Sequence, residues 1–179
     1  MRSKYIVFDR DGTLIKHKPY MYQPQMVELF SDTIDSLVKL KNHGYQFFLH
    51  TNQSGIGRGM FSLKDAQKCN ERMIKLIGLG SNIFKKICIA PEYPPTNNGY
   101  RKPSRRFGND IMNEFKIKTE DLIYVGDSLV DIETGNNLGC KTYALNTGLV
   151  NILEKSKCIY KFNHFESLND LTSYLISNE

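Results

Sequence analysis

The chain has 179 residues, 40% of them hydrophobic, and its 24 Lys and Arg against 19 Asp and Glu give a formal net charge of +5. This composition excludes a disordered chain and fits one globular domain over residues 1–179, which we expect to be monomeric. Four cysteines without a CxxC pair are typical of reduced, buried thiols rather than of a zinc or redox site. The first apolar run, Tyr5–Phe8, is too short for a signal-peptide core or a membrane span, so we expect a cytoplasmic protein with no membrane partner.

Short apolar runs and helical patterns alternate along the chain. The runs, which predict buried parallel strands, are Tyr5–Phe8, Phe47–Leu49, Ile87–Ala90, Leu122–Val125 and Thr142–Leu145. The helical patterns run from a Ser31 cap to Asn42, from a Ser62 cap to about Ile77, and over Ser104–Phe115, Leu129–Leu138 and Phe165–Ile176. Because parallel strands need crossovers, this alternation predicts an α/β fold with three layers, α/β/α, around a doubly wound, Rossmann-like parallel sheet.

Two aspartates follow the first predicted strand, in the string Asp9-Arg10-Asp11-Gly12-Thr13-Leu14. Ligands of doubly wound sheets bind beyond the carboxyl ends of the strands, so this position is a candidate site. Carboxylates at positions i and i+2 of an extended chain point to the same side, where they can recruit a cation or divide nucleophilic from acid/base work. Taken alone, the hexapeptide is equally consistent with an ordinary Asp-Gly turn.

The later strand ends carry further polar groups. Thr51–Gly59 offers hydroxyl, amide and glycine N–H groups that a phosphate could meet, although such a segment is more often only a loop. Lys102, after the proline-rich segment Pro91–Gly99, could reach over the strand ends, whereas most lysines are simply solvated. Asp127 and Asp131 follow the fourth strand, and Asp131 could also serve its own helix N-terminus. Together these acids could hold a hard cation.

The order of these motifs is similar to that of a known superfamily. Asp9-x-Asp11-Gly12-Thr13, Thr51-Asn52-Gln53, Lys102-Pro103 and Gly126-Asp127-x-x-x-Asp131 resemble the four motifs of the haloacid dehalogenase superfamily of phosphohydrolases, over residues 5–150. Within the superfamily, the fuller strings around Asp9, Thr51 and Lys102 look like the branch that contains heptose-1,7-bisphosphate 7-phosphatases and the histidinol-phosphate phosphatase domain.

The resemblance implies a Mg²⁺-dependent phosphatase. Asp9 would attack phosphorus to form an aspartyl-phosphate, while Asp11 would protonate the leaving oxygen and then take a proton from water. Asp9, the main-chain carbonyl of Asp11, and Asp127 would hold the Mg²⁺. Lys102 would neutralise charge on the phosphoryl oxygens, and Asp131 would orient either Lys102 or a metal-bound water.

The resemblance also implies a set of substrate contacts. Thr51 and the backbone N–H of Asn52 would hold phosphoryl oxygens, with Gln53 as a further substrate-binding residue. Arg58 and Arg101 are candidates to bind a second phosphate or another polar group. The expected substrate is therefore a small sugar phosphate, heptose 1,7-bisphosphate, which would lose its 7-phosphate during lipopolysaccharide synthesis.

Three alternatives stay open. Histidinol phosphate is the nearest, although we expect no attached second domain for histidine synthesis, which favours the sugar. A nucleic-acid 3′-phosphatase is the next, but the charge of +5 is small and no basic stripe with interleaved aromatic residues is present, so a nucleic-acid partner is not expected. A non-catalytic domain is the least expected, because every side chain that the chemistry needs is present.

One segment departs from the pattern of this branch. Its members usually carry a structural zinc site in the loop after the third strand, but Ala90–Tyr100 contains neither Cys nor His, so no zinc is expected. We expect the three prolines and the packing of Tyr93 or Tyr100 to hold this loop instead. The motifs are too closely spaced for a cap domain, which predicts a capless, open site bordered by loops at Lys16–Pro24 and Pro91–Tyr100. No catalytic role is expected for any histidine, and His50 is interpreted as a core residue.

Overall fold

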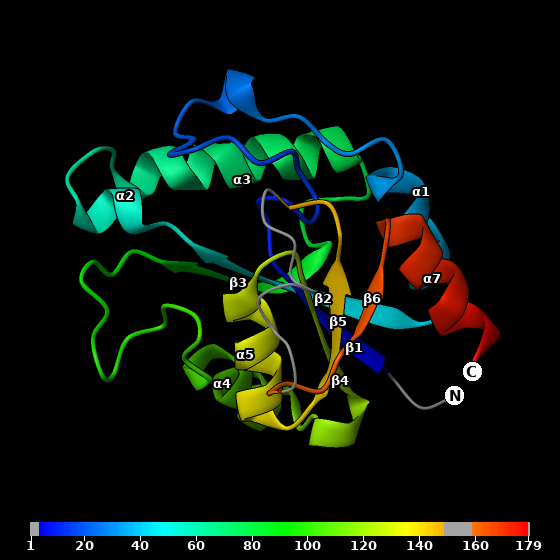
Figure 1. Ribbon diagram of the computed structural model, residues 1–179. Coiled ribbons are helices and arrows are strands. Elements are labelled where there is room, and N and C mark those ends of the chain that lie inside the picture. Colours follow the sequence, from blue (N-terminus) through cyan, green and yellow to red (C-terminus); the bar gives the residue numbers. More distant parts are fainter. Residues whose placement is uncertain (1–3, 149–158, 179) are drawn as a thin grey trace.

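A six-stranded, all-parallel sheet runs through the centre of the computed structural model, which describes residues 4–148 and 159–178 (Figure 1). Its strands are β1 (Lys4–Phe8), β2 (Tyr45–Asn52), β3 (Phe84–Ala90), β4 (Leu122–Gly126), β5 (Lys141–Leu145) and β6 (Asn163–Phe165). They lie in the order β3-β2-β1-β4-β5-β6. The chain therefore winds outward from β1 in one direction and then from β4 in the other, which confirms the doubly wound sheet.

Helices cover both faces of the sheet (Figure 1). On one face lie α1 (Thr33–Asn42), α3 (Leu63–Ile77) and α7 (Leu168–Ser177), and on the other lie α4 (Arg106–Phe115) and α5 (Leu129–Leu138). Three short helices, η1 (Pro24–Met26), α2 (Ser54–Gly57) and η2 (Thr119–Asp121), complete the described elements. Each face of the sheet has its own hydrophobic core, and successive residues of a strand point into opposite cores. Ile6 and Phe8 pack with α1 and α3, whereas Val7 packs with α4.

The five predicted strands and five predicted long helices are all present, but several boundaries differ. Ser31 does not cap the first helix: Asp32 occupies the N-cap position, and its carboxylate accepts a hydrogen bond from the Asn169 backbone N–H at 2.9 Å. Phe165 does not begin the last helix, because it ends β6, a strand that the sequence did not predict. The Ser62 cap is confirmed, as part of a capping box with Asp65.

The structure also tests the predictions of reduced, buried cysteines and of a chain without a membrane span. Cys69 and Cys88 are buried free thiols and Cys140 is partly buried, as expected, whereas Cys158 lies outside the described residues. Burial raises the pKa of the Cys88 and Cys140 thiols to about 12, so both are protonated at neutral pH. Over residues 4–148 and 159–178, no helix is both long and apolar enough to cross a membrane.

The register of the central strands brings the motif residues together. Phe8, the last residue of β1, lies beside Leu49 of β2 and Val125 of β4, and the Asp9 backbone N–H donates to the Val125 carbonyl at 2.9 Å. The segments that follow β1, β2 and β4 therefore begin at the same edge of the sheet. This edge is the switch point between the two winding directions, where doubly wound folds place their sites.

Candidate active site

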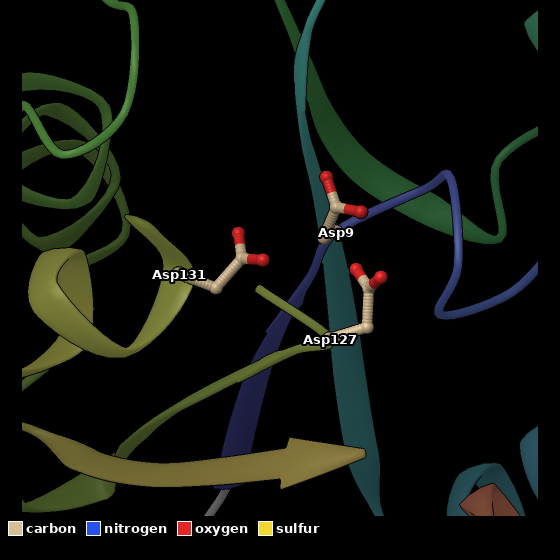
Figure 2. A group of neighbouring side chains, drawn as sticks. All are labelled: Asp9, Asp127 and Asp131. Atoms are coloured by element: carbon tan, nitrogen blue, oxygen red, sulfur yellow. The ribbon is translucent and has the colours of Figure 1, made fainter. Parts of the chain in front are cut away.

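Three buried aspartates meet at this edge (Figure 2). Asp9 follows β1, Asp127 follows β4, and Asp131 lies in the first turn of α5. Each offers one carboxylate oxygen, and these oxygens all lie within 4.8 Å of one another. Figure 2 shows the three carboxylates facing a common space, which is the oxygen-rich arrangement that a hard cation prefers.

Lys102 carries a buried positive charge into this cluster. Its Nζ donates to the Asp9 carboxylate and to Asp131 Oδ1, the latter at 2.6 Å. Burial alone would lower the pKa of Lys102, but the two carboxylates outweigh burial and raise it, so the ammonium stays charged. The other oxygen of Asp131 accepts from the Ser128 backbone N–H at 3.1 Å and from the Ser128 hydroxyl. Asp131 is thus anchored by its own helix while it orients Lys102.

One ammonium does not balance three carboxylates. Burial raises the pKa of Asp9 to about 7, although Lys102 lowers it, and the carboxylates of Asp131 and Asp11 raise it further. Burial, then Asp9 and Asp131, raise the pKa of Asp127 to about 8. A divalent cation between these oxygens would remove the repulsion, so the donor set fits Mg²⁺ by charge and by ligand type.

Two glycines allow the acids to approach one another. A Cβ on Gly12 would lie 2.1 Å from Asp127 Oδ2, and the φ of Gly12 is +89°, a value that L side chains rarely adopt. A Cβ on Gly126 would lie 2.2 Å from the carboxyl carbon of Asp131. At these two positions the motif needs glycine because the backbone lies against a carboxylate.

Asp11 belongs to a separate group of contacts. Gln53 Nε2 donates to Asp11 Oδ2 at 3.0 Å and to Thr51 Oγ1 at 2.8 Å, while Thr51 Oγ1 donates to Asp11 Oδ2 at 3.3 Å. The buried guanidinium of Arg10 also binds this carboxylate, with a shortest separation of 2.8 Å. The Asp11 carboxylate is therefore held by these partners and not by Lys102, while Asp11 still lines the same hollow as Asp9. Its main-chain carbonyl as a metal ligand stays a prediction.

The backbone N–H of Asn52 as a phosphate ligand stays a prediction, while the side chains of Asn52 and Arg58 contact other parts of the protein. The Asn52 amide accepts from the Lys102 backbone N–H at 2.9 Å and donates to the Lys102 carbonyl at 3.2 Å, so it positions the lysine. The guanidinium carbon of Arg58 lies 3.4 Å from the centre of the Tyr93 ring. Arg101 is half-buried, and its Nη1 has no hydrogen-bond partner among the described residues. Neither arginine lines the two hollows at the site.

Two adjoining hollows open beside Asp11. The first, of about 360 Å³, contains Asp9, Lys102 and Asp127. The second, of about 330 Å³, is lined by residues of the 17–21 loop and by Ser54, Gly55 and Phe61. Asp11, His17 and Asn52 line both. Sequence reasoning gave His17 no role, although its place in the short loop after the first motif could have marked it as a site residue.

Tyr93 and Tyr100 both anchor the 91–100 loop, which confirms the expected contribution of these residues, while the role of the three prolines stays a prediction. The Tyr100 backbone N–H donates to Glu92 Oε1 at 2.6 Å, and the Tyr100 hydroxyl donates to Asp110 Oδ2 at 2.8 Å. Tyr93 stacks against Arg58, which ties the loop to α2. The structure thus shows protein contacts that can fix the loop in place of cysteine and histidine ligands.

His50 is a core residue, as predicted. Burial, and then the charge of Lys102, lower its pKa to about 3, so the ring is neutral. One ring nitrogen lies 2.8 Å from the Tyr100 carbonyl oxygen and the other 2.8 Å from the Tyr124 hydroxyl. A neutral ring satisfies both by donating to the carbonyl and accepting from the hydroxyl, so His50 connects β2, β4 and the loop.

Comparison with known proteins identifies the relatives of this chain. The sequence model of the family described as Polynucleotide kinase 3 phosphatase matches residues 4–149. A protein of Thermoplasma acidophilum named as a probable D-glycero-D-manno-heptose-1,7-bisphosphate 7-phosphatase is 30% identical over 138 residues, which cover 76% of this chain and 86% of that protein. The histidine biosynthesis bifunctional protein HisB of Legionella pneumophila is 31% identical over 140 residues, 76% of this chain but only 40% of HisB.

Solved structures share the fold. The D,D-heptose 1,7-bisphosphate phosphatase of B. bronchiseptica, complexed with magnesium and phosphate, superposes with a TM-score of 0.90 at 22% identity, covering 98% of this chain and 99% of that one. The corresponding phosphatase of Burkholderia thailandensis gives a TM-score of 0.72 at 23% identity, with 98% and 99% covered. The chain belongs to the polynucleotide kinase 3 phosphatase family of haloacid dehalogenase-like hydrolases, and it is a phosphatase.

Proposed function

We propose that the chain is a Mg²⁺-dependent sugar-phosphate phosphatase that removes the 7-phosphate of D-glycero-D-manno-heptose 1,7-bisphosphate. The observation that carries the chemistry is the buried Asp9 carboxylate, held by Lys102 beside two further aspartates. The choice of substrate is supported by the Thermoplasma acidophilum relative, which this chain matches over 86% of that relative's length. The proposal places the enzyme in the cytoplasm, as a monomer, in the synthesis of lipopolysaccharide sugars.

In the first step, a carboxylate oxygen of Asp9 attacks phosphorus and the bond to the leaving oxygen breaks. Asp11 gives its proton to that oxygen, so that the sugar departs as an alcohol and Asp11 becomes a carboxylate. Lys102 is suited to balance the charge of the phosphoryl group, because two carboxylates hold its ammonium beside Asp9. The Thr51 hydroxyl and the Asn52 backbone N–H bind phosphoryl oxygens.

In the second step, a water molecule attacks the phosphorus of the aspartyl-phosphate and gives a proton to Asp11. The bond between phosphorus and Asp9 breaks, which releases inorganic phosphate and restores both aspartates. Asp9, Asp127 and the main-chain carbonyl of Asp11 would hold Mg²⁺, with Asp131 keeping Lys102 in place. When bound, the ion supplies positive charge that offsets the negative charge of the carboxylates and the phosphate.

The leaving group lies in the second hollow, beyond Asp11. This hollow is lined by His17 from the loop after the first motif and by Asn52, Gln53 and Ser54, whose polar groups suit the hydroxyls of a sugar. Arg58 and Arg101 remain candidates for a distant second phosphate only if they leave their present positions. An open hollow of this kind suits a small substrate that carries several hydroxyl groups.

Two other substrates are supported by specific observations. Histidinol phosphate is supported by the HisB relatives, although this chain spans only about two fifths of their length. A 3′-phosphorylated nucleic acid is supported by the name of the family and by exposed tyrosines at the rim. Tyr20 lines the second hollow, and Tyr22 stacks on Phe61 with ring centres 6.1 Å apart. Exposed rings of this kind can stack on bases.

The test is phosphate release with Mg²⁺ from heptose 1,7-bisphosphate, histidinol phosphate and a 3′-phosphorylated oligonucleotide. Asp9→Asn is the blank, and Asp35→Asn, an exposed change on α1, is the matched control. We expect the highest kcat/KM with the heptose, no turnover by Asp9→Asn, and loss of activity in EDTA that Mg²⁺ restores. A preference for either other substrate overturns the heptose assignment, and turnover by Asp9→Asn overturns the mechanism.

A further inference from the structure

Arg10 binds the Asp11 carboxylate from inside the protein. Its side chain is fully buried, and it lies between the two aspartates of the first motif. Nε donates to Asp11 Oδ2 at 2.9 Å and Nη2 donates to Oδ1 at 3.1 Å, a two-pronged contact. Such a pair fixes the plane of the carboxylate as well as its position.

Asn70 in turn holds Arg10. It lies in the middle of α3, is 3% exposed, and its Oδ1 accepts from Arg10 Nη1 at 2.8 Å. Its amide nitrogen is buried and has no hydrogen-bond partner among the described residues. The amide nitrogen therefore contributes nothing to stability, and the asparagine acts here through its other polar atom. Its acceptor oxygen both satisfies the buried guanidinium of Arg10 and fixes its orientation.

The contacts of Asp11 distinguish its two oxygens. Oδ2 lies within hydrogen-bond distance of Arg10, Gln53 and Thr51, whereas Oδ1 accepts only from Arg10 among the described residues. A carboxylate oxygen has two lone-pair sites, so Oδ1 keeps one free and Oδ2 does not. The free site on Oδ1 is the place for the proton that Asp11 gives to the leaving oxygen.

We propose that Asn70 and Arg10 are positioning residues, which hold Asp11 so that Oδ1 carries the transferred proton. The inference rests on the proposed function, in which Asp11 is the acid. The contact reaches from α3 to the end of β1, across 60 residues of sequence. Neither residue takes up or releases a proton itself: they set the direction of a transfer that Asp11 makes.

The test compares two esters that differ in their need for the proton. Heptose 1,7-bisphosphate has an alcohol leaving group that must be protonated, whereas the nitrophenolate of p-nitrophenyl phosphate leaves without help. Asn70→Leu keeps the volume and removes the acceptor. We expect its kcat for the heptose to fall by at least ~10-fold and its kcat for the aryl ester to fall much less, because general acid catalysis contributes about 10²- to 10⁴-fold in total. Asn70→Asp, which keeps an acceptor oxygen, should recover most of the heptose rate.

Met73→Val is the matched control, since Met73 is buried in the same helix and its side chain has no polar contact with Arg10. It should change both rates in proportion. Equal losses for both esters in Asn70→Leu would overturn the proposal, as would failure of Asn70→Asp to recover the rate. If Asn70→Leu does not fold, Asn70→Ser is measured in the same way. The proposed function fails separately, if hydrolysis of both esters persists in Asp9→Asn.

Discussion

Two regions at the same edge of the sheet are built in opposite ways. The acid cluster, consisting of Asp9, Lys102, Asp127 and Asp131, is buried, and its members hold one another by charge. The 91–100 loop lies at the surface and is held by separate contacts, among them the Tyr93 ring, which is 45% exposed. One region is a network of buried charges, and the other is a set of independent surface contacts.

The difference bears on what each region can tolerate. Removing one partner of a buried ion pair leaves an uncompensated charge, which destabilises a protein by about 3–5 kcal/mol, whereas exposed cation–π contacts contribute only about 0.5–1 kcal/mol. The acid cluster therefore has little freedom to vary. The loop can change its residues while the chemistry stays the same, which fits a loop that has no zinc ligands.

The largest effect is expected for Lys102→Met, which removes the one ammonium between Asp9 and Asp131. We expect kcat to fall by ~10³-fold or more and the free energy of unfolding to fall by about 3–5 kcal/mol. Urea unfolding and phosphate release measure the two. Lys86→Met is the control, because Lys86 pairs with Glu114 at the surface. Similar losses in both variants would show that the cluster is no different from a surface pair.

Gly12→Ala tests the close approach inside the cluster. The new Cβ would lie 2.1 Å from Asp127 Oδ2, so Asp127 must move. We expect a loss of ~10²-fold in kcat/KM, together with a weaker apparent affinity for Mg²⁺ in titrations of activity. Gly44→Ala is a matched control, because Gly44 has a similar φ of +81° but no atom within 4 Å of the added carbon. Gly44→Ala should be destabilised by backbone strain while it keeps its activity.

The elements that could be predicted from the sequence are those marked by apolar runs or by a local capping residue. The sequence located the strands that carry the site and the Ser62 cap, because buried strands are continuous apolar runs and caps follow local chemistry. It missed β6, since Asn163–Phe165 has only three residues and is largely exposed. It placed the start of the first helix wrongly because Asp32 is held by Asn169, a partner far away in the sequence.

The acids and Lys102 of the site were also predictable, because each follows a strand in motif order. The partners of Arg10, Asn52 and Arg58 were not, since they depend on contacts between distant segments. The resemblance implies a phosphate contact for the backbone N–H of Asn52, and Arg58 is a candidate for a second phosphate, but the fold gives both side chains protein partners. A motif thus identifies the residue types of a site before it identifies which side chains are free.

The pH dependence of stability sharpens the comparison, because two carboxyl groups of the acid cluster have pKa values near neutrality. The folded state raises the pKa of Asp9 to about 7 and of Asp127 to about 8, from 3.8. Between pH 3.8 and these raised pKa values, the folded protein binds more protons than the unfolded chain. The free energy of unfolding therefore falls as pH rises through this range. His50 has the opposite effect on stability, because folding lowers its pKa from 6.5 to about 3. Its contribution therefore rises with pH, but only below about pH 6.5.

Metal-free protein should therefore lose stability between about pH 6.5 and 8, by at most about 1.4 kcal/mol per pH unit for each carboxylate. Mg²⁺ competes with these protons, so it should stabilise the protein most at the alkaline end. Thermal unfolding in EDTA and in Mg²⁺ across this range measures both effects. Asp127→Asn should flatten the curve, and an equally steep curve in that variant would assign the effect to other groups.

The smallest effect is expected in the loop, from the contact between Arg58 and Tyr93. Arg58→Ala, Tyr93→Ala and the double variant form a cycle whose coupling energy should be about 0.5–1 kcal/mol in unfolding experiments. If Arg58 only stacks on Tyr93, the double variant should have the same KM as Tyr93→Ala alone. If Arg58 instead binds the second phosphate of the substrate, KM rises in both backgrounds, and the loop then shares in recognition. In that case the surface region takes part in specificity, and the division between a catalytic cluster and a replaceable loop no longer holds.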